Sequence, residues 1–324
     1  MKKDWTLYAH HILDCINKIK QIKWVDKKQM KINLCHFIVS FFLFLPTSYA
    51  VAWTSLPLAF NTGNPEPHGL PSTIISIQGK ILPIIFDTGA SKSEITLSHH
   101  ALKGLSVEFT GNQVCTTALD GEHCEPEFII PEVTLGDIVL KNVKGTLMEQ
   151  LWGGDDDGFI STEASENGVI GYDLLKKFNI LLDYPNKQAV LFNKGEKPKN
   201  YDISNWIAIP FTDHLKTKVI LNKKVLTLSW DTGSVPSIIK TSIANEMIIS
   251  QCDQNTPYGK EEDCKRIVTN SFYTLGDHAE LPLTWFLVKD IPQQAPFDGL
   301  IGSNFYMEHL VYFDFAHHQI LVKP

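Results

Sequence analysis

The sequence contains the tripeptide Asp-Thr-Gly twice, at 87–89 and 231–233, each time at the end of an apolar run typical of a β-strand. An aspartate at a strand end can be held rigidly, and the following glycine lets backbone N–H groups turn toward its carboxylate. Two such carboxylates in one partly desolvated site cannot both ionise cheaply, so they are expected to share one proton. Asp87 and Asp231 are therefore suited to general acid–base chemistry: one activates a water molecule and the other protonates a carbonyl oxygen, without metal or cofactor.

The two tripeptides lie within a longer internal repeat, and each follows a predicted β-hairpin. The predicted strands are 73–77 and 81–86 in the first copy, with a turn at Gly79-Lys80, and 218–221 and 225–230 in the second, with a turn at Asn222-Lys223. The spacing between copies is 144 residues at the aspartates and 131 near the end of the repeat, which indicates duplication with changes in loop length. Other recurring segments are Thr134–Asp137 with Thr274–Asp277, Asn167–Gly171 with Asp298–Gly302, and Leu181–Tyr184 with Tyr312–Phe315.

Length and composition agree with two globular units. The chain has 324 residues, of which 44% are hydrophobic and 20% charged, enough for about two domains. Short β-type runs separated by Gly, Pro, Asn and Asp predict a mainly β fold. We expect an N-terminal lobe at 51–193, which opens with an extended segment at 51–70, then a linker at 194–205 and a C-terminal lobe at 206–324. Short helices are predicted at 97–103, 172–178, 242–249 and 304–310.

Residues 1–50 differ from the rest of the chain. A lysine-rich stretch leads into the apolar run 32–45, which is followed by small residues up to Ala50. This pattern is typical of a secretory signal peptide cleaved after Ala50, and Met30 would make a more ordinary start. An uncleaved anchor is the alternative, although the run is short for a membrane span. The sequence therefore predicts an exported protein, periplasmic or secreted.

Charge limits the partners that the mature protein could have. Residues 1–50 hold 8 Lys and 3 Asp, so the remainder has 21 basic and 33 acidic residues and a net charge of −12. Such a charge argues against nucleic acid and against an electrostatically bound membrane.

Four cysteines remain after the leader, two in each repeat. In an exported protein, an even set with short local spacing predicts the disulfides Cys115–Cys124 and Cys252–Cys264. Zinc is a weaker interpretation, because neither pair has Cys-x-x-Cys spacing or an organised histidine partner.

The paired Asp-Thr-Gly motifs and the repeat around them resemble the retropepsin and pepsin superfamily of aspartic peptidases. The resemblance covers nearly all of 71–324 and is closest to a bacterial retropepsin-like protein with two units fused in one chain. The resemblance implies a bilobal fold of two acid-protease barrels related by a pseudo-twofold axis, with Asp87 and Asp231 as the catalytic pair. It also implies that Thr88 and Thr232 interlock the two loops, which further contain Gly89, Ala90, Gly233 and Ser234. The segments ending in Ile170-Gly171 and Ile301-Gly302 are expected to pass beneath these loops, and the Ser234 hydroxyl could bond Asp231 and lower its pKa.

The superfamily closes a β-hairpin flap over its substrate. The first repeat offers a candidate flap at 116–121, which includes Ala118, Leu119, Asp120 and Gly121 but lacks the tyrosine of the pepsin flap. The second offers a candidate between its cysteines, with Tyr258 and Gly259, but this segment is charged and irregular.

The expected function is that of a monomeric aspartic endopeptidase acting on a polypeptide. One alternative is an inactive peptide-binding or scaffold protein that keeps the fold. Another is an enzyme activated by release of 51–70 or by cleavage in the linker.

Overall fold

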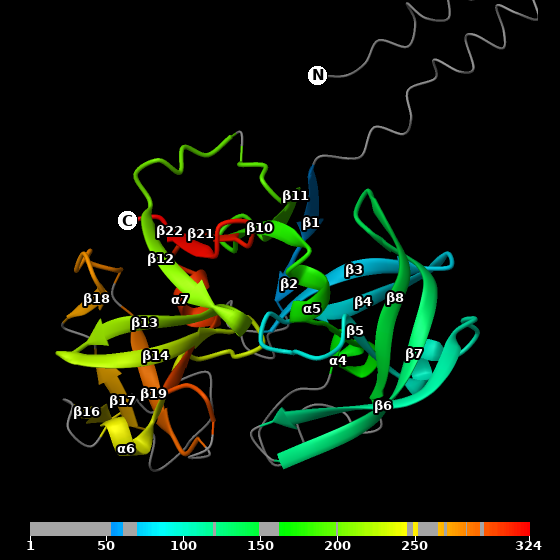
Figure 1. Cartoon of the computed structure of the whole chain (residues 1–324), viewed down its shortest axis with the longest axis horizontal. Helices are drawn as coiled ribbons and strands as arrows, with labels where there is room; N and C mark the ends of the chain where they lie inside the picture. Colours follow the sequence, from blue (N-terminus) through cyan, green and yellow to red (C-terminus); the bar gives the residue numbers. More distant parts are fainter. Residues whose placement is uncertain are drawn as a thin grey trace, which may run out of the picture. The chain divides into compact units, whose positions relative to one another are not determined.

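A computed structural model of the chain describes residues 53–60, 70–118, 121–148, 162–198, 200–244, 249–251, 265–268, 271–282, 284–291 and 295–324 (Figure 1). Residues 51–324 form one compact unit, and the predicted leader 1–50 lies outside the described residues. The fold is mainly β, as the sequence predicts. None of the helices in the described ranges is long and apolar enough to cross a membrane.

The first repeat contains strands β1 (Trp53–Pro57), β2 (Ala59–Phe60), β3 (Pro71–Ile77), β4 (Lys80–Phe86), β5 (Ile95–Ser98), β6 (Glu108–Ala118), β7 (Gly121–Leu135), β8 (Ile138–Met148), β9 (Gly168–Ile170), β10 (Phe178–Asp183) and β11 (Gln188–Asn193). Eight of the strands described here make one sheet in the order β2-β3-β4-β9-β5-β8-β7-β6, and β3 also pairs with β7. The additional β3–β7 pairing folds this sheet back on itself, which gives the lobe a barrel-like form.

The second repeat contains strands β12 (Ile207–Thr212), β13 (Lys216–Leu221), β14 (Lys224–Trp230), β15 (Ile238–Lys240), β16 (Ile249–Gln251), β17 (Lys265–Val268), β18 (Phe272–Thr274), β19 (Trp285–Lys289), β20 (Gly299–Ile301), β21 (Val311–Asp314) and β22 (Gln319–Val322). Its sheet repeats the pattern of the first around the site: β14 pairs with β20, which pairs with β15, as β4 pairs with β9 and β9 with β5.

Six strands join the repeats in the order β1-β11-β10-β21-β22-β12. At the centre, β10 runs antiparallel to β21, with Leu181 opposite Tyr312. Strand β1 pairs with β11 along its whole length, and Leu56 is fully buried. The described part of the predicted entry segment, 53–60, is therefore extended, and its pairing into the sheets argues against release of this part as an activation step.

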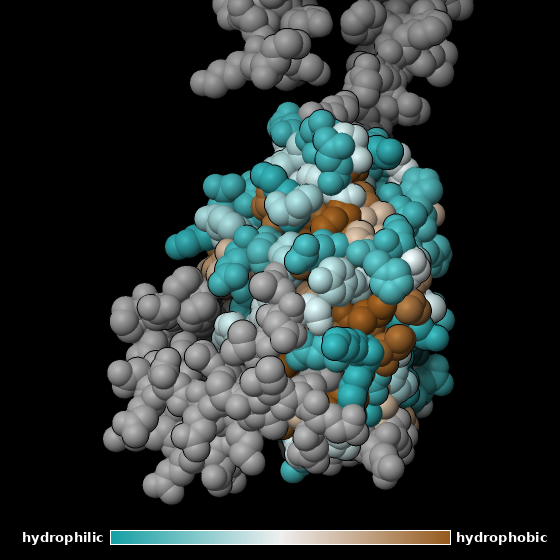
Figure 2. Space-filling model, turned by 90° about the vertical axis from the view of Figure 1, so that its left-hand side faces the viewer, coloured by the Kyte–Doolittle hydropathy of each residue, from teal (hydrophilic) through white to brown (hydrophobic). Residues whose placement is uncertain are grey.

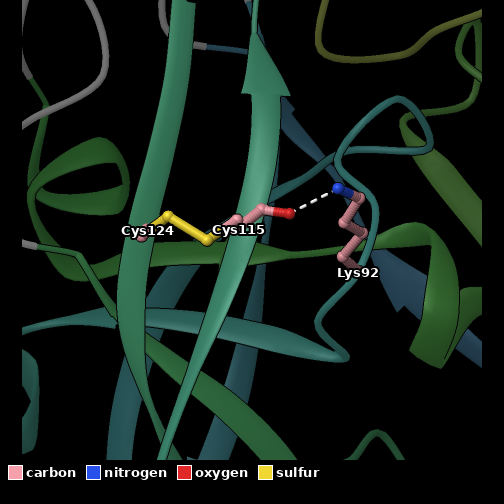
Figure 3. Close-up of a disulfide and its surroundings, with 3 residues drawn as sticks. All are labelled: Lys92, Cys115 and Cys124. Atoms are coloured by element: carbon pink, nitrogen blue, oxygen red, sulfur yellow. Dashed lines mark hydrogen bonds between the residues drawn. A yellow bond between two sulfur atoms is a disulfide. The ribbon is translucent and has the colours of Figure 1, made fainter.

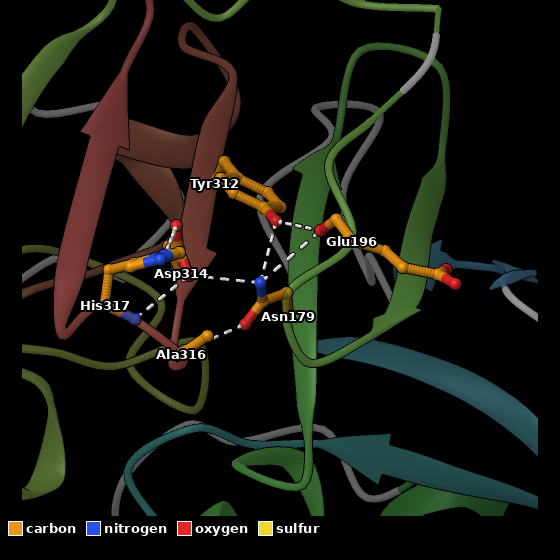
Figure 4. Close-up of polar contacts among 6 residues, drawn as sticks. All are labelled: Asn179, Glu196, Tyr312, Asp314, Ala316 and His317. Atoms are coloured by element: carbon orange, nitrogen blue, oxygen red, sulfur yellow. Dashed lines mark hydrogen bonds and ion pairs between the residues drawn. The ribbon is translucent and has the colours of Figure 1, made fainter.

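Side chains also join the repeats at this central pairing (Figure 4). The Asn179 amide on β10 donates to Asp314 Oδ1 (3.1 Å) and Tyr312 Oη (2.9 Å), both on β21. Its oxygen accepts from the backbone N–H of Ala316 (3.2 Å), while Tyr312 Oη donates to the carbonyl of Glu196 (2.8 Å). Buried polar groups of both repeats thus satisfy one another.

The predicted hairpins are present, with one difference in the turns. The first turn is Gln78-Gly79, with φ of 52° and 84°, one residue earlier than expected, whereas the second is Asn222-Lys223 as predicted, with φ of 47° and 69°. Positive φ at both central positions is the geometry that suits a two-residue turn to the twist of its strands.

Three helices are shorter than predicted: α3 (His99–Leu102), α5 (Tyr172–Leu175) and α7 (Ser303–Tyr306). The predicted helix 242–249 corresponds to α6 (Thr241–Ala244), after which 245–248 lie outside the described residues. The other helical elements are α4 (Glu163–Asn167) and a 3₁₀ turn, η3 (Asp213–Leu215). Strands limit α3 and α5: β5 extends to Ser98 before α3, and β10 begins at Phe178 soon after α5.

The largest apolar core cluster draws on both repeats, with Phe86, Phe128, Trp230, Phe305 and Phe313 among its fully buried side chains. The coloured part of the face in Figure 2 is mostly hydrophilic, with a few small groups of hydrophobic side chains. Exposed apolar residues such as Val225 (57%) and Leu275 (39%) occur singly in the sequence, and scattered apolar exposure is normal for a folded domain.

Candidate active site

Two equivalent strand pairs deliver the aspartates. Strand β4 runs parallel to β9, with Phe86 opposite Ile170, and β14 runs parallel to β20, with Trp230 opposite Ile301. The backbone N–H of Asp87 continues the first pairing by donating to the Ile170 carbonyl (3.0 Å), and that of Asp231 donates to the Ile301 carbonyl (2.9 Å). Each aspartate therefore lies at the end of a buried pair of parallel strands, at the last hydrogen-bonded position.

The segments after these strands lie beneath the two loops. The Gly171 N–H donates to Glu94 and that of Tyr172 to Ala90, while the Ser303 N–H donates to Ser234. A Cβ at Gly171 would lie 2.8 Å from the Ala90 carbonyl oxygen, and one at Gly302 would lie 2.3 Å from that of Pro236. Glycine is required at both positions because a side chain would collide with the loop backbone.

The two threonines lock the loops together. Thr88 Oγ1 accepts from the Thr232 N–H (3.0 Å) and donates to the Trp230 carbonyl (3.0 Å). In return, Thr232 Oγ1 accepts from the Thr88 N–H (2.9 Å) and donates to the Phe86 carbonyl (2.8 Å). Each hydroxyl thus joins two backbone groups of the other repeat, and both threonines are buried.

The lock brings the carboxyl groups together. A Cβ built on Gly89 would lie 2.4 Å from Asp231 Cγ, and one on Gly233 would lie 2.4 Å from Asp87 Cγ. Each carboxyl group therefore rests against the glycine of the opposite tripeptide, in space that only glycine leaves free. Asp87 Oδ1 accepts from the N–H groups of Gly89 (2.7 Å) and Ala90 (3.1 Å), and Asp231 Oδ1 accepts from that of Gly233 (2.8 Å).

Burial and proximity perturb both acids. Asp87 is 7% exposed and Asp231 is partly exposed. Burial raises the pKa of Asp87, although hydrogen bonds from Asp231 and the loop N–H groups oppose the rise. The pKa of Asp231 lies well above its usual range, because burial and the negative charge of Asp87 both disfavour a second carboxylate. Burial and mutual repulsion therefore favour a state in which the pair shares one proton.

Ser234 does not make the bond that the resemblance implies. Its hydroxyl donates to the Pro236 carbonyl (2.6 Å), because the loop turns back over Gly302 and brings that carbonyl into reach. The hydroxyl therefore stabilises the loop instead of lowering the pKa of Asp231. Ala90, its counterpart, contributes its backbone N–H to Asp87.

A lysine that the sequence analysis did not identify connects the first loop to the β6–β7 hairpin. The Lys92 backbone N–H donates to Asp173 Oδ2 (2.8 Å), and its Nζ donates to the carbonyl of Cys115 on β6 (Figure 3). Cys115 lies directly opposite Cys124 on β7, and the two form a disulfide. The sequence signal was only the position of Lys92, three residues after Gly89.

The candidate flap of the first repeat is the end of this hairpin, where Ala118 pairs with Gly121. Leu119 and Asp120 at its tip lie outside the described residues, as do Tyr258 and Gly259. The predicted pair Cys252–Cys264 also lies outside them. In the part of the chain that the structure describes, no three His, Cys, Asp or Glu side chains gather as metal ligands would.

Comparisons with known proteins support the fold. No family model matches the sequence, and no curated protein matches it. Among solved structures, the chain is similar to the aspartic proteinase from Irpex lacteus, with a TM-score of 0.55 and 13% sequence identity, over 84% of this chain and 97% of that chain. The chain therefore has the bilobal, mainly β fold of pepsin-like aspartic proteinases.

Proposed function

We propose that the protein is an aspartic endopeptidase that hydrolyses peptide bonds with a water molecule activated between Asp87 and Asp231. The observation that carries the proposal is the contact of each carboxyl group with the glycine of the opposite tripeptide. That contact places two acids of unequal proton affinity side by side, which is the arrangement that general acid–base hydrolysis requires.

The unequal pKa values assign the starting roles. Asp87, whose carboxylate accepts two backbone N–H groups, is the general base that removes a proton from the attacking water. Asp231, which holds the shared proton, donates it to the carbonyl oxygen of the scissile peptide bond. The tetrahedral intermediate then returns its hydroxyl proton to Asp231 as the C–N bond breaks, while Asp87 passes the water-derived proton to the leaving nitrogen.

The lock between the loops supports catalysis by positioning. Four hydrogen bonds of Thr88 and Thr232 fix the two strand ends against each other. Because the acids are held before substrate arrives, little reorganisation is needed when charge moves between them. An extended polypeptide is the proposed substrate, since a chain of that form could pair with strand edges near the site.

Export is a further part of the proposal. The disulfide Cys115–Cys124 supports an oxidising compartment such as the periplasm or the exterior of a cell. Because one chain supplies both aspartates, a monomer is sufficient to build the site.

Hydrolysis of a denatured protein by the purified chain tests this function. The assay spans acid to neutral pH, with and without pepstatin, beside Asp87→Asn and the control Asp290→Asn, whose side chain is exposed. We expect cleavage by the wild type and the control, and a loss of at least about 10³-fold in Asp87→Asn. If wild type and Asp87→Asn behave alike at every pH, the chain is not this enzyme, and an inactive peptide-binding protein becomes the better account.

A further inference from the structure

Three buried hydroxyl groups gather behind the second catalytic loop. They belong to Tyr184, which follows β10, and to Ser303 and Tyr306 on α7. All three side chains are at most 1% exposed, and none of their hydroxyls has a hydrogen-bond partner among the described residues. The rings of Tyr184 and Tyr306 are in contact, with centroids 5.4 Å apart.

The cluster lies close to the aspartates. Tyr306 packs against Trp230, the residue before Asp231, with ring centroids 6.3 Å apart. Ser303 directly follows Gly302, which lies beneath the Ser234–Pro236 turn. The charges of Asp231 and Asp87 also help raise the pKa of both phenols, although burial is the larger cause.

Ser303 and Tyr184 are close but do not bond well. The Ser303 and Thr232 side chains both oppose the rise in the pKa of Tyr184 that burial causes, so both lie near its hydroxyl, yet neither contact meets hydrogen-bond geometry. Buried polar side-chain atoms nearly always have a partner, and each exception requires an explanation. Three buried hydroxyl groups without a partner in one cluster suggest a common explanation.

The residues at the equivalent positions of the repeat carry fewer hydroxyl groups. At the repeat spacing of 131 residues, Ser303 and Tyr306 correspond to Tyr172 and Leu175 of the first repeat. At the same spacing, Tyr184 corresponds to Phe315. The contacts correspond as well, since Tyr172 meets Phe315 with ring centroids 5.9 Å apart. That cluster has one hydroxyl, Tyr172 Oη, and it accepts from the His214 N–H (3.2 Å).

The second cluster therefore has a small side chain where the first has a tyrosine ring, and two extra hydroxyls around it. This combination of space and several convergent polar groups is what an internal water molecule requires. We propose that Tyr184, Ser303 and Tyr306 bind one internal water molecule behind the Asp231 loop. The proposal stands whether or not the aspartates are catalytic, since it concerns the hydration of the fold.

A crystal structure of the full chain at high resolution is the first test. We expect an electron-density peak within hydrogen-bonding distance of all three hydroxyls. Absence of that peak in well-ordered density overturns the proposal.

Thermal unfolding of Tyr184→Phe, Ser303→Ala and Tyr306→Phe is the second test, with Tyr273→Phe, a partly exposed tyrosine, as the control. If the hydroxyls bind water, each variant loses a hydrogen bond, and its Tm falls by about 2–4 °C while the control changes little. If the hydroxyls have no partner at all, their removal relieves a cost, so an unchanged or higher Tm in the tyrosine variants counts against the water site.

Discussion

The carboxyl groups of Asp87 and Asp231 are close because both tripeptides lack a side chain at their third position. Any larger residue at Gly89 would occupy the space of the Asp231 carboxyl group, and the same holds for Gly233 and Asp87. Gly89 and Gly233 take no part in the proposed chemistry, but they leave the space that lets the two aspartates lie close together.

The raised pKa of Asp231 gives stability a distinct pH dependence. The folded protein holds this proton more tightly than the unfolded chain, whose aspartates titrate near about 4. The contribution to the free energy of unfolding is therefore full below about pH 4 and is lost as pH rises through the folded pKa.

Asp231→Asn removes this contribution. We predict that the difference in Tm between wild type and Asp231→Asn shifts in favour of the variant as pH rises from 4 to neutrality, measured by circular dichroism. A difference that stays constant with pH would mean that the pKa of Asp231 is not raised by folding.

Gly89→Ala should lower activity by about 10²-fold without unfolding the protein. The new methyl group would lie 2.4 Å from Asp231 Cγ, so that carboxyl group must move, and a displacement of about 1 Å at a reacting group can cost about 10²-fold in rate. Gly79→Ala is the control, because φ there is +84° but nothing lies within 4 Å. It should lose stability by about 1 kcal/mol and keep its activity. Equal activities of the two variants in a peptide assay would contradict the account.

At the scale of elements, the β6–β7 hairpin is tied to the first catalytic loop by one side chain. Lys92 bonds the carbonyl of Cys115, and the disulfide fixes Cys115 to the opposite strand. The disulfide-bonded part of the hairpin is therefore held in register with the first catalytic loop.

Lys92→Met keeps the length of the side chain and removes this hydrogen bond. We predict a fall in kcat/KM of about fivefold, because an exposed charge-assisted bond contributes about 1 kcal/mol. Lys141→Met, on strand β8, is the matched control and should leave kcat/KM unchanged. A loss of the same size in both variants would show a general effect of charge and not of the hairpin base.

The sequence predicted these elements unevenly, for physical reasons. The hairpins before each aspartate were predictable because period-two patterns and turn residues are local signals. The helices were predicted too long, because strand pairing by β5 and β10 takes residues that a helical pattern also fits. The Lys92 contact could not be predicted, since it depends on the approach of a strand more than twenty residues away.

At the scale of the molecule, the repeats are joined by the pairing of β10 with β21 and by the polar contacts of Asn179. The duplication itself was visible in the sequence, and with it the expectation that both aspartates meet. The burial of Asp183 and Asp314 was not visible in the sequence, because an aspartate near a turn suggests exposure. In the structure both side chains are at most 4% exposed. Each has a local partner three residues along the chain, Asn186 for Asp183 and His317 for Asp314. The partners that come from farther away, Tyr201 for Asp183 and Asn179 for Asp314, leave no local signal.

Asn179→Ala tests the importance of this connection. The change removes the donor to Asp314 and Tyr312, while Asp314 still accepts from the His317 N–H and Tyr312 still donates to the Glu196 carbonyl. The free energy of unfolding should therefore fall by about 1–2 kcal/mol. Urea denaturation measures the change, with exposed Asn112→Ala expected to stay within about 0.5 kcal/mol of wild type. If Asn179→Ala is as stable as the control, the contact does not help hold the repeats together.

The central claim is that Asp87 and Asp231 share one proton, and carboxyl ¹³C NMR of aspartate-labelled protein titrated from acid to neutral pH tests it most directly. Assignment by Asp87→Asn and Asp231→Asn identifies the two signals. If the two acids share a proton, the titration has two coupled steps, and the Asp231 signal still reports a protonated group well above pH 4. Two independent titrations near pH 4 would contradict it, because carboxyl groups that ionise separately do not form a pair.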